Sequence, residues 1–318
     1  MFIEIRNPGH KLRISNGLLE IQEPQSSSDS AEPRRMFRIP PKDLKGLVIE
    51  TPQTLISAAV IVRLTEAGVP IVLCDEGHKP TAEVSSAWGA QGAERAKLLR
   101  AQVLLRADTK ARLWKQIVRQ KLKLQSATLD LLAAGDGAAR LRRLAEEVRP
   151  GDPENREATG AQIYWRALMG RSFLRRDTED NTNALLNYGY AVLRSALLRR
   201  LHESGLHPAF GIHHANDENP GNLADDLLEP FRPAVDRLVH LLRQRDDDTQ
   251  LTPALKSCLA ELPNYPVNVG GQWMLLTNAM LETTRSHAAI LSGERNRHTL
   301  PEQLEEPKKC PTPGDPCG

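Results

Sequence analysis

Apolar residues in the first part of the chain occur in short runs separated by turn residues. Runs of this length predict short strands, and they lie at Phe2–Ile5, Leu18–Ile21, Leu47–Ile49 and Pro70–Cys74. The segment Thr54–Ala67 is rich in apolar residues and is followed by Gly68, so it predicts a helix that stops at a glycine. The pattern therefore indicates a β-rich region that contains one helix.

The pattern changes near residue 90, where helical spacing takes over. Residues 91–124 contain no proline and carry a stripe of apolar residues. Two later stretches repeat apolar residues every three or four positions, as a buried helical face requires: Leu186, Tyr190, Leu193, Leu197 and Leu201, then Leu223, Leu227, Phe231, Val235, Leu238 and Leu242. We predict an α+β protein with a small N-terminal β-rich domain (1–88), a larger all-helical domain (89–301) and a disordered tail (302–318).

The overall charge does not identify a binding partner, but one segment is strongly basic. The chain has 42 Lys and Arg residues against 40 Asp and Glu residues, which gives a net charge of +2. Residues 94–123 alone hold ten basic residues and two acidic ones. A helix with this charge can follow a phosphate backbone. The alternative is an ordinary helix whose charged face is turned to solvent.

Cysteine usage and the lack of long apolar runs bear on the cellular environment. Cys74, Cys258, Cys310 and Cys317 form no C-x-x-C pair, so we predict reduced thiols rather than a zinc site or a disulfide framework. The N-terminal sequence MFIEIRNPGHKLRIS lacks the apolar core of a signal peptide. No run reaches the roughly 18 apolar residues that span a membrane. We expect a soluble, cytoplasmic protein with no membrane partner.

A glutamate lies on the inward face of a predicted helix. Asp152 is a good N-cap, and Pro153 suits the first helical position. Glu157 shares its face with apolar residues at spacings of 4, 3 and 4, namely Ala161, Tyr164 and Leu168. An inward carboxylate is costly unless a cation or a donor meets it. That partner could be a metal ion, or an arginine such as Arg156 or Arg171.

A second group of candidate ligands follows further along the chain. His213 and His214 precede a loop rich in turn residues, and a predicted helix then carries Asp226 and Glu229 three positions apart. Pro230 directly follows and disturbs the helical ladder, so it can turn Glu229 toward a pocket. One imidazole with carboxylates suits Mg²⁺ or Mn²⁺. Taken separately, the histidines also fit a surface or capping role, and the acidic helix fits a solvated face.

These motifs occur in an order that is typical of one protein family. Residues 152–173 read DPENREATGAQIYWRALMGRSF, and residues 183–233 read NALLNYGYAVLRSALLRRLHESGLHPAFGIHHANDENPGNLADDLLEPFRP. The sequence resembles the CRISPR-associated spacer-acquisition integrase/endonuclease family, in particular the subtype that accompanies single-protein (type II) effectors. The N-terminal stretch 39–81 is also similar to that subtype. The resemblance covers nearly the whole chain except the loop at 24–35 and the tail.

The resemblance implies a role for individual residues. The family's catalytic metal ligands match Glu157, His214 and Glu229, with His213 as the alternative histidine. Asp226 matches an acidic position that supports the ligands or adds one. The arginines that lie just beyond these motifs are the DNA-binding candidates, namely Arg171, Arg175, Arg176 and Arg232. The implied cofactor is Mg²⁺ or Mn²⁺.

The resemblance also implies an activity and an assembly. It predicts a DNA endonuclease and integrase that inserts short foreign DNA into a CRISPR array, through attack of a 3′-hydroxyl on repeat phosphodiesters. The implied partners are double-stranded DNA (prespacer and repeat), a second copy of the chain, and a small ferredoxin-like protein in a heterohexamer, with the type II effector as a further candidate. The alternatives are an inactive DNA-binding scaffold of the same complex and an unrelated metal-dependent phosphodiesterase.

Overall fold

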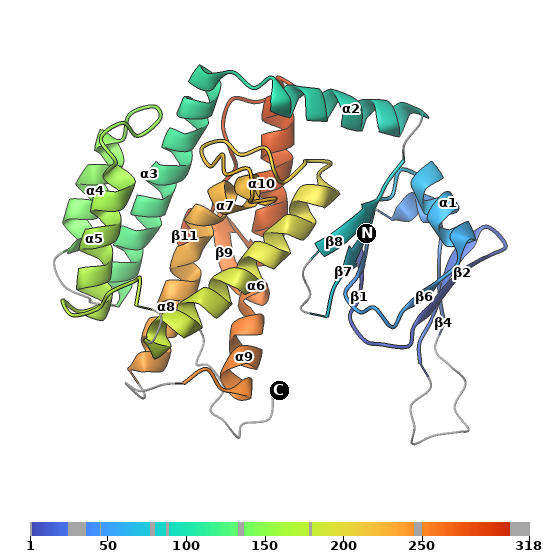
Figure 1. Cartoon of the computed structure of the whole chain (residues 1–318), viewed down its shortest axis with the longest axis horizontal. Coiled ribbons are helices and arrows are strands. Elements are labelled where there is room, and N and C mark those ends of the chain that lie inside the picture. Colours follow the sequence, from blue (N-terminus) through green and yellow to red (C-terminus); the bar gives the residue numbers. More distant parts are fainter. Residues whose placement is uncertain are drawn as a thin grey trace. The chain divides into compact units, whose positions relative to one another are not determined.

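The computed structural model describes residues 2–24, 36–44, 46–76, 80–86, 89–132, 137–177, 180–244 and 250–305 (Figure 1). The chain forms two compact units. The first is Met1–Arg100 with Leu201–Leu206, and the second is Ala101–Arg200 with His207–Gly318. The division falls after Arg100, whereas the sequence pattern placed it at residue 88. Most of helix α2 (Gly89–Val103) therefore belongs to the first unit.

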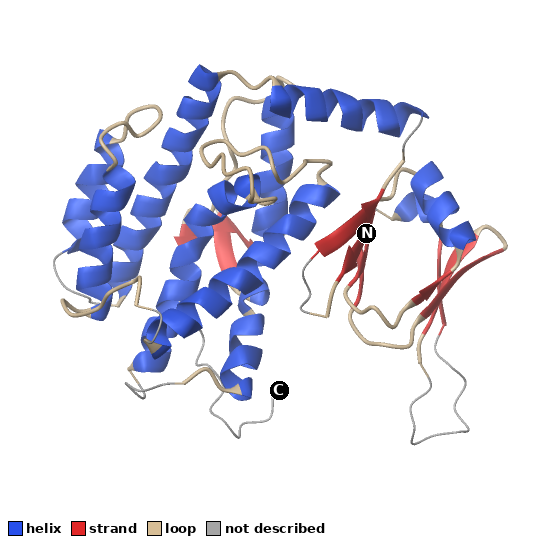
Figure 2. Cartoon of the chain, viewed as in Figure 1, coloured by secondary structure: helices blue, strands red, loops and turns tan. Residues whose placement is uncertain are grey.

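The described part of the first unit contains two four-stranded sheets (Figure 2). One sheet has the order β1-β5-β7-β8, built from Phe2–Ile5, Gly46–Ile49, Ile71–Cys74 and Pro80–Val84. Its first three strands are parallel, and β8 is antiparallel to β7. The other sheet has the order β4-β3-β2-β6, built from Met36–Ile39, Leu18–Gln22, Lys11–Ser15 and Leu55–Ile56. The predicted β-rich region is confirmed.

One helix and a tight hairpin complete the core of this unit. Helix α1 (Ala58–Glu66) buries Val60 and Leu64 completely against the strands. The turn between β2 and β3 is Asn16-Gly17, and both residues have positive φ, at 49° and 76°. This left-handed pair is the turn that matches the twist of a two-residue hairpin. The predicted helix at 54–67 is thus shorter than expected, because Leu55–Ile56 pairs with β2 as strand β6.

The second unit is mainly helical. Helix α3 (Ala107–Leu131) packs with α4 (Gly137–Glu147) and α5 (Arg156–Met169), as Figure 1 shows. The remaining helices and 3-10 turns are α6 (Asn181–Glu203), α7 (Asn222–Leu228), η2 (Glu229–Phe231), α8 (Arg232–Arg243), α9 (Pro253–Ala260), η3 (Leu262–Asn264) and α10 (Leu276–Leu291). The predicted apolar stripes face inward: Leu186, Leu193, Leu197 and Leu223 are 0% exposed.

A small sheet in the second unit corrects the expectation of an all-helical domain. Strand β9 (Pro266–Val269) pairs antiparallel with β10 (Gln272–Leu275) and with β11 (Gln303–Leu304). Strand β11 lies within the tail predicted to be disordered, and its pairing orders the chain through that point. Strand β11 has only two residues, which is too few for an alternating apolar pattern. The sequence pattern therefore could not predict it. Residues 306–318 lie outside the described part.

The apolar stripe over 91–124 belongs to two helices rather than one. Helix α2 ends at Val103, and α3 begins at Ala107 after an extended Arg106 (φ −64°, ψ 144°). No proline or glycine marks this break. Leu104, which lies at the break, is 76% exposed. Burial of its side chain therefore does not favour one continuous helix across this point.

Two findings bear on the environment of the chain. Cys74 is buried and forms no disulfide bond, but Cys258 on α9 is disulfide-bonded, so the prediction of reduced thiols is wrong for Cys258. Disulfide pairing depends on the distance between the two Cα atoms, which cysteine spacing in a sequence does not give. Among the described residues, none of the helices has the length and apolarity needed to cross a membrane.

Candidate active site

The site begins where α3 and α5 touch. A Cβ atom built on Gly160 of α5 would lie 2.2 Å from Leu122 Cδ2 of α3, so glycine permits the close approach of the two helices. Lys121 directly precedes Leu122, and Glu157 lies one turn before Gly160. Because residues three apart share a helical face, the tight contact brings Lys121 and Glu157 together.

The start of α5 fixes the position of Glu157. The helix begins at Arg156, and Asn155 is its N-cap, with its side chain accepting the Ala158 N–H at 3.4 Å. Asp152 accepts the N–H of Arg156 at 2.9 Å and of Glu157 at 3.0 Å. The sequence pattern predicted a helix that begins at Pro153. The helix begins later because Asp152 and Asn155 both adopt left-handed backbone conformations, which these residue types tolerate.

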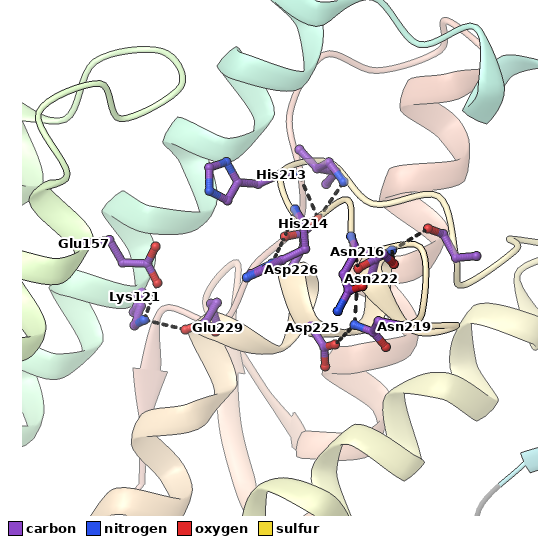
Figure 3. Close-up of polar contacts among 12 residues, drawn as sticks. Lys121, Glu157, His213, His214, Asn216, Asn219, Asn222, Asp225, Asp226 and Glu229 are labelled. Atoms are coloured by element: carbon purple, nitrogen blue, oxygen red, sulfur yellow. Dashed lines mark hydrogen bonds and ion pairs between the residues drawn. The ribbon is translucent and has the colours of Figure 1, made fainter. Parts of the chain in front are cut away.

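A lysine lies between two of the three predicted ligands (Figure 3). Lys121 Nζ is 2.6 Å from Glu157 Oε1 and 2.5 Å from Glu229 Oε2. Lys121 is 8% exposed and Glu229 is 5% exposed. The two carboxylates, which come from α5 and η2, therefore meet at one cation. The arginine partners proposed for Glu157 are wrong, and Arg156 instead pairs with Glu147 at 3.3 Å.

Opposite charges outweigh burial in this cluster. Burial alone would raise the pKa of Glu229, but Lys121 and Arg232 hold that pKa below its ordinary value. Burial would likewise lower the pKa of Lys121, yet the charges of Glu229 and Glu157 raise it. The cluster therefore consists of charged groups that depend on one another, and removal of one member would leave a buried charge without its partner.

The turn after α7 sets the position of Glu229. Helix α7 ends at Leu228, and Glu229–Phe231 form the 3-10 turn η2 that contains Pro230. The predicted interruption of the helix at this proline is confirmed. Arg232, which opens α8, donates from Nε to Glu229 Oε1 at 2.8 Å. Its guanidinium also lies 4.6 Å from the centre of the Tyr190 ring. Glu229 is thus held between Arg232 and Lys121.

Asp226 orients His214. The Asp226 carboxylate is 0% exposed and accepts three backbone N–H groups, from Ile212 at 2.6 Å, His213 at 2.9 Å and His214 at 3.2 Å. The His214 ring donates from Nδ1 to Asp226 Oδ1 at 2.6 Å, which leaves Nε2 as the nitrogen able to bind a ligand. This hydrogen bond raises the pKa of His214 against the opposing effect of burial. Asp226 therefore fixes the His214 ring, which is what the supporting role implied by the family resemblance would require of it.

The turn before the histidines needs a glycine. A Cβ atom on Gly211 would lie 2.2 Å from the His214 carbonyl oxygen and 3.0 Å from Asp226 Oδ2. Any larger residue would displace the turn from the carboxylate. Gly211 thus allows one aspartate to bind three consecutive backbone N–H groups.

His213 points elsewhere. Its ring stacks on Trp114 of α3, with ring centres 4.2 Å apart and planes 3° from parallel. Trp114 is 1% exposed, so His213 covers the tryptophan. Figure 3 shows His213 directed away from Asp226 while His214 faces it. Between the two histidines, His214 has the geometry that a ligand requires, because a carboxylate fixes its ring.

The donor set suits a hard divalent ion, but it is not arranged as a finished metal site. Two carboxylates and one imidazole are ligands that Mg²⁺ and Mn²⁺ accept. Glu229 Oε2 is buried and lies 2.5 Å from the Lys121 ammonium, so this oxygen already meets a cation. Within the described residues, however, no three His, Cys, Asp or Glu side chains already surround one point. The Lys121 ammonium lies where the two carboxylates converge.

The four predicted DNA-binding arginines fall into two groups. Arg171 and Arg176 are exposed in the segment that follows α5. Arg175 donates to Asn183 Oδ1 at 2.9 Å and to Asn187 Oδ1 at 2.7 Å, so its guanidinium is held within the protein. Arg232 is bound to Glu229 as described above. The exposed pair is the more available for a phosphate.

Lys121 entered the sequence prediction only as one of ten basic residues, and its place in the site was missed. A signal for it does exist. Lys121 falls on the buried stripe of α3, at spacings of 3, 4 and 4 through Trp114, Ile117, Lys121 and Gln125, all at most 8% exposed. A lysine on an apolar stripe requires an anionic partner, just as an inward glutamate requires a cation.

Other basic residues of 94–123 have acidic partners. Arg95 pairs with Glu83, and Lys97 pairs with Glu94 at 2.7 Å. Arg119 and Lys123 both pair with Glu146. The local positive charge is therefore partly compensated within the protein.

The fold and the site together define an α+β protein with a charged, partly buried centre in its helical unit. The family model described as CRISPR associated protein Cas1 matches residues 3–253. The chain is 37% identical over 300 residues to the CRISPR-associated endonuclease Cas1 of Neisseria meningitidis serogroup C (strain 8013), covering 93% of this chain and 94% of the relative. The chain belongs to the Cas1 family of CRISPR-associated proteins.

One further relative matches in sequence, and two solved structures match in fold. A CRISPR-associated endonuclease Cas1 of Thermus thermophilus is 27% identical over 257 residues, covering 75% of this chain and 74% of the relative. A solved casposase bound to integration product matches with a TM-score of 0.68 and 20% identity, over 94% of this chain and 97% of that one. A Cas1 protein from Thermotoga maritima matches with a TM-score of 0.65 and 15% identity, over 93% of this chain and 97% of that one.

Proposed function

We propose that the chain is a divalent-metal-dependent DNA endonuclease and integrase that inserts short DNA fragments into a CRISPR array. Membership of the Cas1 family and the endonuclease name of its relatives support the reaction class. The similar casposase is described as bound to an integration product, which fits the joining activity. The observation that carries the proposal is the meeting of Glu157 and Glu229 at one cation, in the same site as a histidine whose ring is fixed by Asp226.

In this proposal Glu157, His214 and Glu229 hold Mg²⁺ or Mn²⁺. Asp226 keeps the proton on His214 Nδ1, so that Nε2 is available. Arg232 supplies positive charge beside Glu229, and Arg171 and Arg176 offer exposed guanidinium groups to DNA phosphates. A bound divalent ion would lower the pKa of the attacking hydroxyl and neutralise charge on the phosphate.

The reaction itself is a phosphodiester exchange. The 3′-hydroxyl oxygen of the captured fragment forms a bond to a repeat phosphorus atom, and the bond from that phosphorus to the repeat 3′-oxygen breaks. The proton of the attacking hydroxyl is released, and the departing 3′-oxygen takes one up. With water as the attacking group, the same site cleaves DNA. The protein mainly positions the strands and stabilises charge.

The same family membership supports a proposal for the assembly. We propose double-stranded DNA as the substrate, a homodimer formed through the β-rich unit, and a heterohexamer with a small ferredoxin-like protein. A similar solved structure is a partial Cas6-RT-Cas1–Cas2 complex, with a TM-score of 0.66 and 15% identity over 97% of this chain and 99% of that one. That description supports a second Cas protein as the partner.

A strand-transfer assay tests the function. The purified chain is mixed with a fragment that has free 3′-hydroxyls, a plasmid that contains the repeat, the small partner protein, and Mn²⁺ or Mg²⁺. We expect joined products that need the divalent ion and disappear in the Glu157→Ala variant. Cleavage without joining would indicate a nuclease alone.

A surface variant controls for nonspecific loss of charge. Glu282→Gln removes an exposed carboxylate of the same unit, which pairs with Arg285 on α10, and it should join DNA at the wild-type rate. If the folded wild-type chain gives neither joining nor cleavage with the partner present, it is an inactive scaffold. The Lys121 ammonium between two predicted ligands is the observation that favours this second function.

A further inference from the structure

The charges around Lys121 are already balanced before any metal ion binds. Its ammonium is in contact with both Glu157 and Glu229, and the lysine side chain is only 11% exposed. Glu229 also binds Arg232, so two positive groups already neutralise two carboxylates. A divalent ion at the same carboxylate oxygens would place two further positive charges beside the ammonium. Like charges at such short range in a buried site repel strongly.

The lysine is suited to leave when a metal ion arrives. Its ammonium is a point charge on a flexible four-carbon stem, so it can turn without movement of the helix. The guanidinium of Arg232 is more constrained, because it also lies over the Tyr190 ring. Of the two cations, Lys121 is therefore the one that can move away from the carboxylates.

A displaced ammonium needs another anion. A lysine released from both glutamates would be left partly buried and unpaired, which is costly. The groups that DNA brings to this site are phosphates, and an ammonium binds phosphate well. A DNA phosphate can thus take the place that the glutamates give up.

We propose that Lys121 is an internal counter-ion that competes with the divalent ion for Glu157 and Glu229, and that a DNA phosphate takes over its ammonium when the metal binds. The inference rests on the metal site of the proposed function. Metal and DNA then strengthen each other's binding. The DNA phosphate draws the Lys121 ammonium away from the carboxylates that the metal needs, and the metal frees that ammonium to bind the phosphate. By linkage, the factor by which DNA tightens metal binding equals the factor by which metal tightens DNA binding.

A purely structural role for Lys121 makes the opposite prediction. If the lysine served only to hold the two carboxylates in place, its removal would let them separate and would weaken metal binding. If it competes with the metal, removal frees the carboxylate oxygens and strengthens metal binding. The sign of the change in Mn²⁺ affinity therefore distinguishes the two roles.

The experiment measures Mn²⁺ affinity without DNA, from the electron paramagnetic resonance signal of free Mn²⁺. It compares the full-length wild type with Lys121→Met and Lys121→Gln, whose folding is checked by circular dichroism. We expect the neutral variants to bind Mn²⁺ about tenfold more tightly, within the usual range of coupling between two sites. Lys121→Arg keeps the charge and should not gain affinity.

Lys123→Met is the matched control. Lys123 lies on the same helix two residues further on, and it pairs with Glu146 rather than with a predicted ligand. Its substitution should leave Mn²⁺ affinity unchanged, although it removes the same charge from the chain.

A second measurement tests the coupling. Fluorescence anisotropy with a labelled DNA duplex, whose 3′ ends are dideoxy-terminated, gives DNA affinity with and without Mn²⁺. Mn²⁺ should tighten DNA binding roughly tenfold in the wild type and very little in Lys121→Met. Equal enhancement by Mn²⁺ in both proteins would overturn the coupling.

The outcomes separate the two proposals. If Glu157→Ala binds Mn²⁺ as well as the wild type does, the proposed metal site itself fails. If Glu157→Ala loses Mn²⁺ while Lys121→Met and Lys121→Gln bind it as the wild type does, or more weakly, the metal site stands and the counter-ion role is overturned.

Discussion

Two histidine pairs in the helical unit show how neighbouring groups decide the use of one residue type. His213 and His214 are adjacent in the sequence, yet one stacks on Trp114 and the other is bound to Asp226. His287 and His298 are eleven residues apart in the sequence, yet their rings stack and His287 Nδ1 lies 3.0 Å from His298 Nε2.

The two pairs differ in their acidic neighbours. Asp226 raises the pKa of His214 and fixes its ring, which leaves one nitrogen directed outward. No carboxylate is among the groups that act on His287, and burial lowers its pKa to about 4. The first arrangement suits a ligand, while the second suits a neutral pair inside the protein. A carboxylate partner, rather than a histidine doublet, is therefore the better sign of a functional site.

The largest effect should come from His214→Ala, which removes the one imidazole that a carboxylate orients in this site. We expect the rate of DNA joining to fall by more than the roughly 10- to 100-fold that loss of a supporting residue costs. The rate is measured with the strand-transfer assay at saturating Mn²⁺. His287→Gln is the comparison: if the folded variant lost joining to the same extent, the contrast between the two pairs would collapse.

The buried His287 should affect the dependence of stability on pH. Between pH 6.5 and 4 the unfolded chain protonates a histidine that the folded chain keeps neutral, so stability falls as the pH decreases. A pKa of His287 lowered to about 4 corresponds to a loss of about 3 kcal/mol across this range. Urea denaturation of the wild type and His287→Gln at several pH values measures it. Parallel pH profiles for the two proteins would contradict this account.

Asp226→Asn should weaken the site by an intermediate amount. The neutral amide no longer favours a proton on His214 Nδ1, so the orientation and basicity of the ring are less well defined. We expect Mn²⁺ affinity to fall roughly 10- to 100-fold. Asp225→Asn is the matched control on the same helix, because Asp225 pairs with Arg194 rather than with a histidine. Equal losses in both variants would assign the effect to general damage of α7.

The smallest effect should follow from His213→Ala. The variant loses the stacking of the ring on Trp114, which is worth about 0.5–1.5 kcal/mol. We expect a corresponding decrease in the free energy of unfolding and only a few-fold change in the joining rate. A loss of joining comparable to that of His214→Ala would make His213 the ligand instead.

Much of the fold could be predicted because it depends on local patterns. The apolar stripes of α6, α7 and α8, the strands β1, β3, β5 and β7 of the first unit and the interruption at Pro230 follow from spacing and residue type. Strands β2, β4, β6 and β8 were not predicted. The small sheet of the second unit could not be predicted, because β11 has two residues and pairs with a strand far away in the sequence. The helix start at Arg156 was also missed, since left-handed turns at Asp152 and Asn155 depend on packing around them.

The sequence by itself indicated which residues form the candidate site, but it did not indicate which of them contact one another. Helical spacing places Glu157 on an inward face, and the family motif identifies His214, Asp226 and Glu229 as candidate site residues. These are local properties, because a helix repeats every 3.6 residues whatever it packs against.

Only the tertiary structure decided which of these residues meet. Close packing at Gly160 and Leu122 brings Lys121 to Glu157, and η2 brings Glu229 to the same ammonium. The choice between the two histidines likewise depends on Trp114 and Asp226, which come from different helices. Charge pairing acts over a few ångströms in space regardless of separation along the chain, so no local pattern could have specified it.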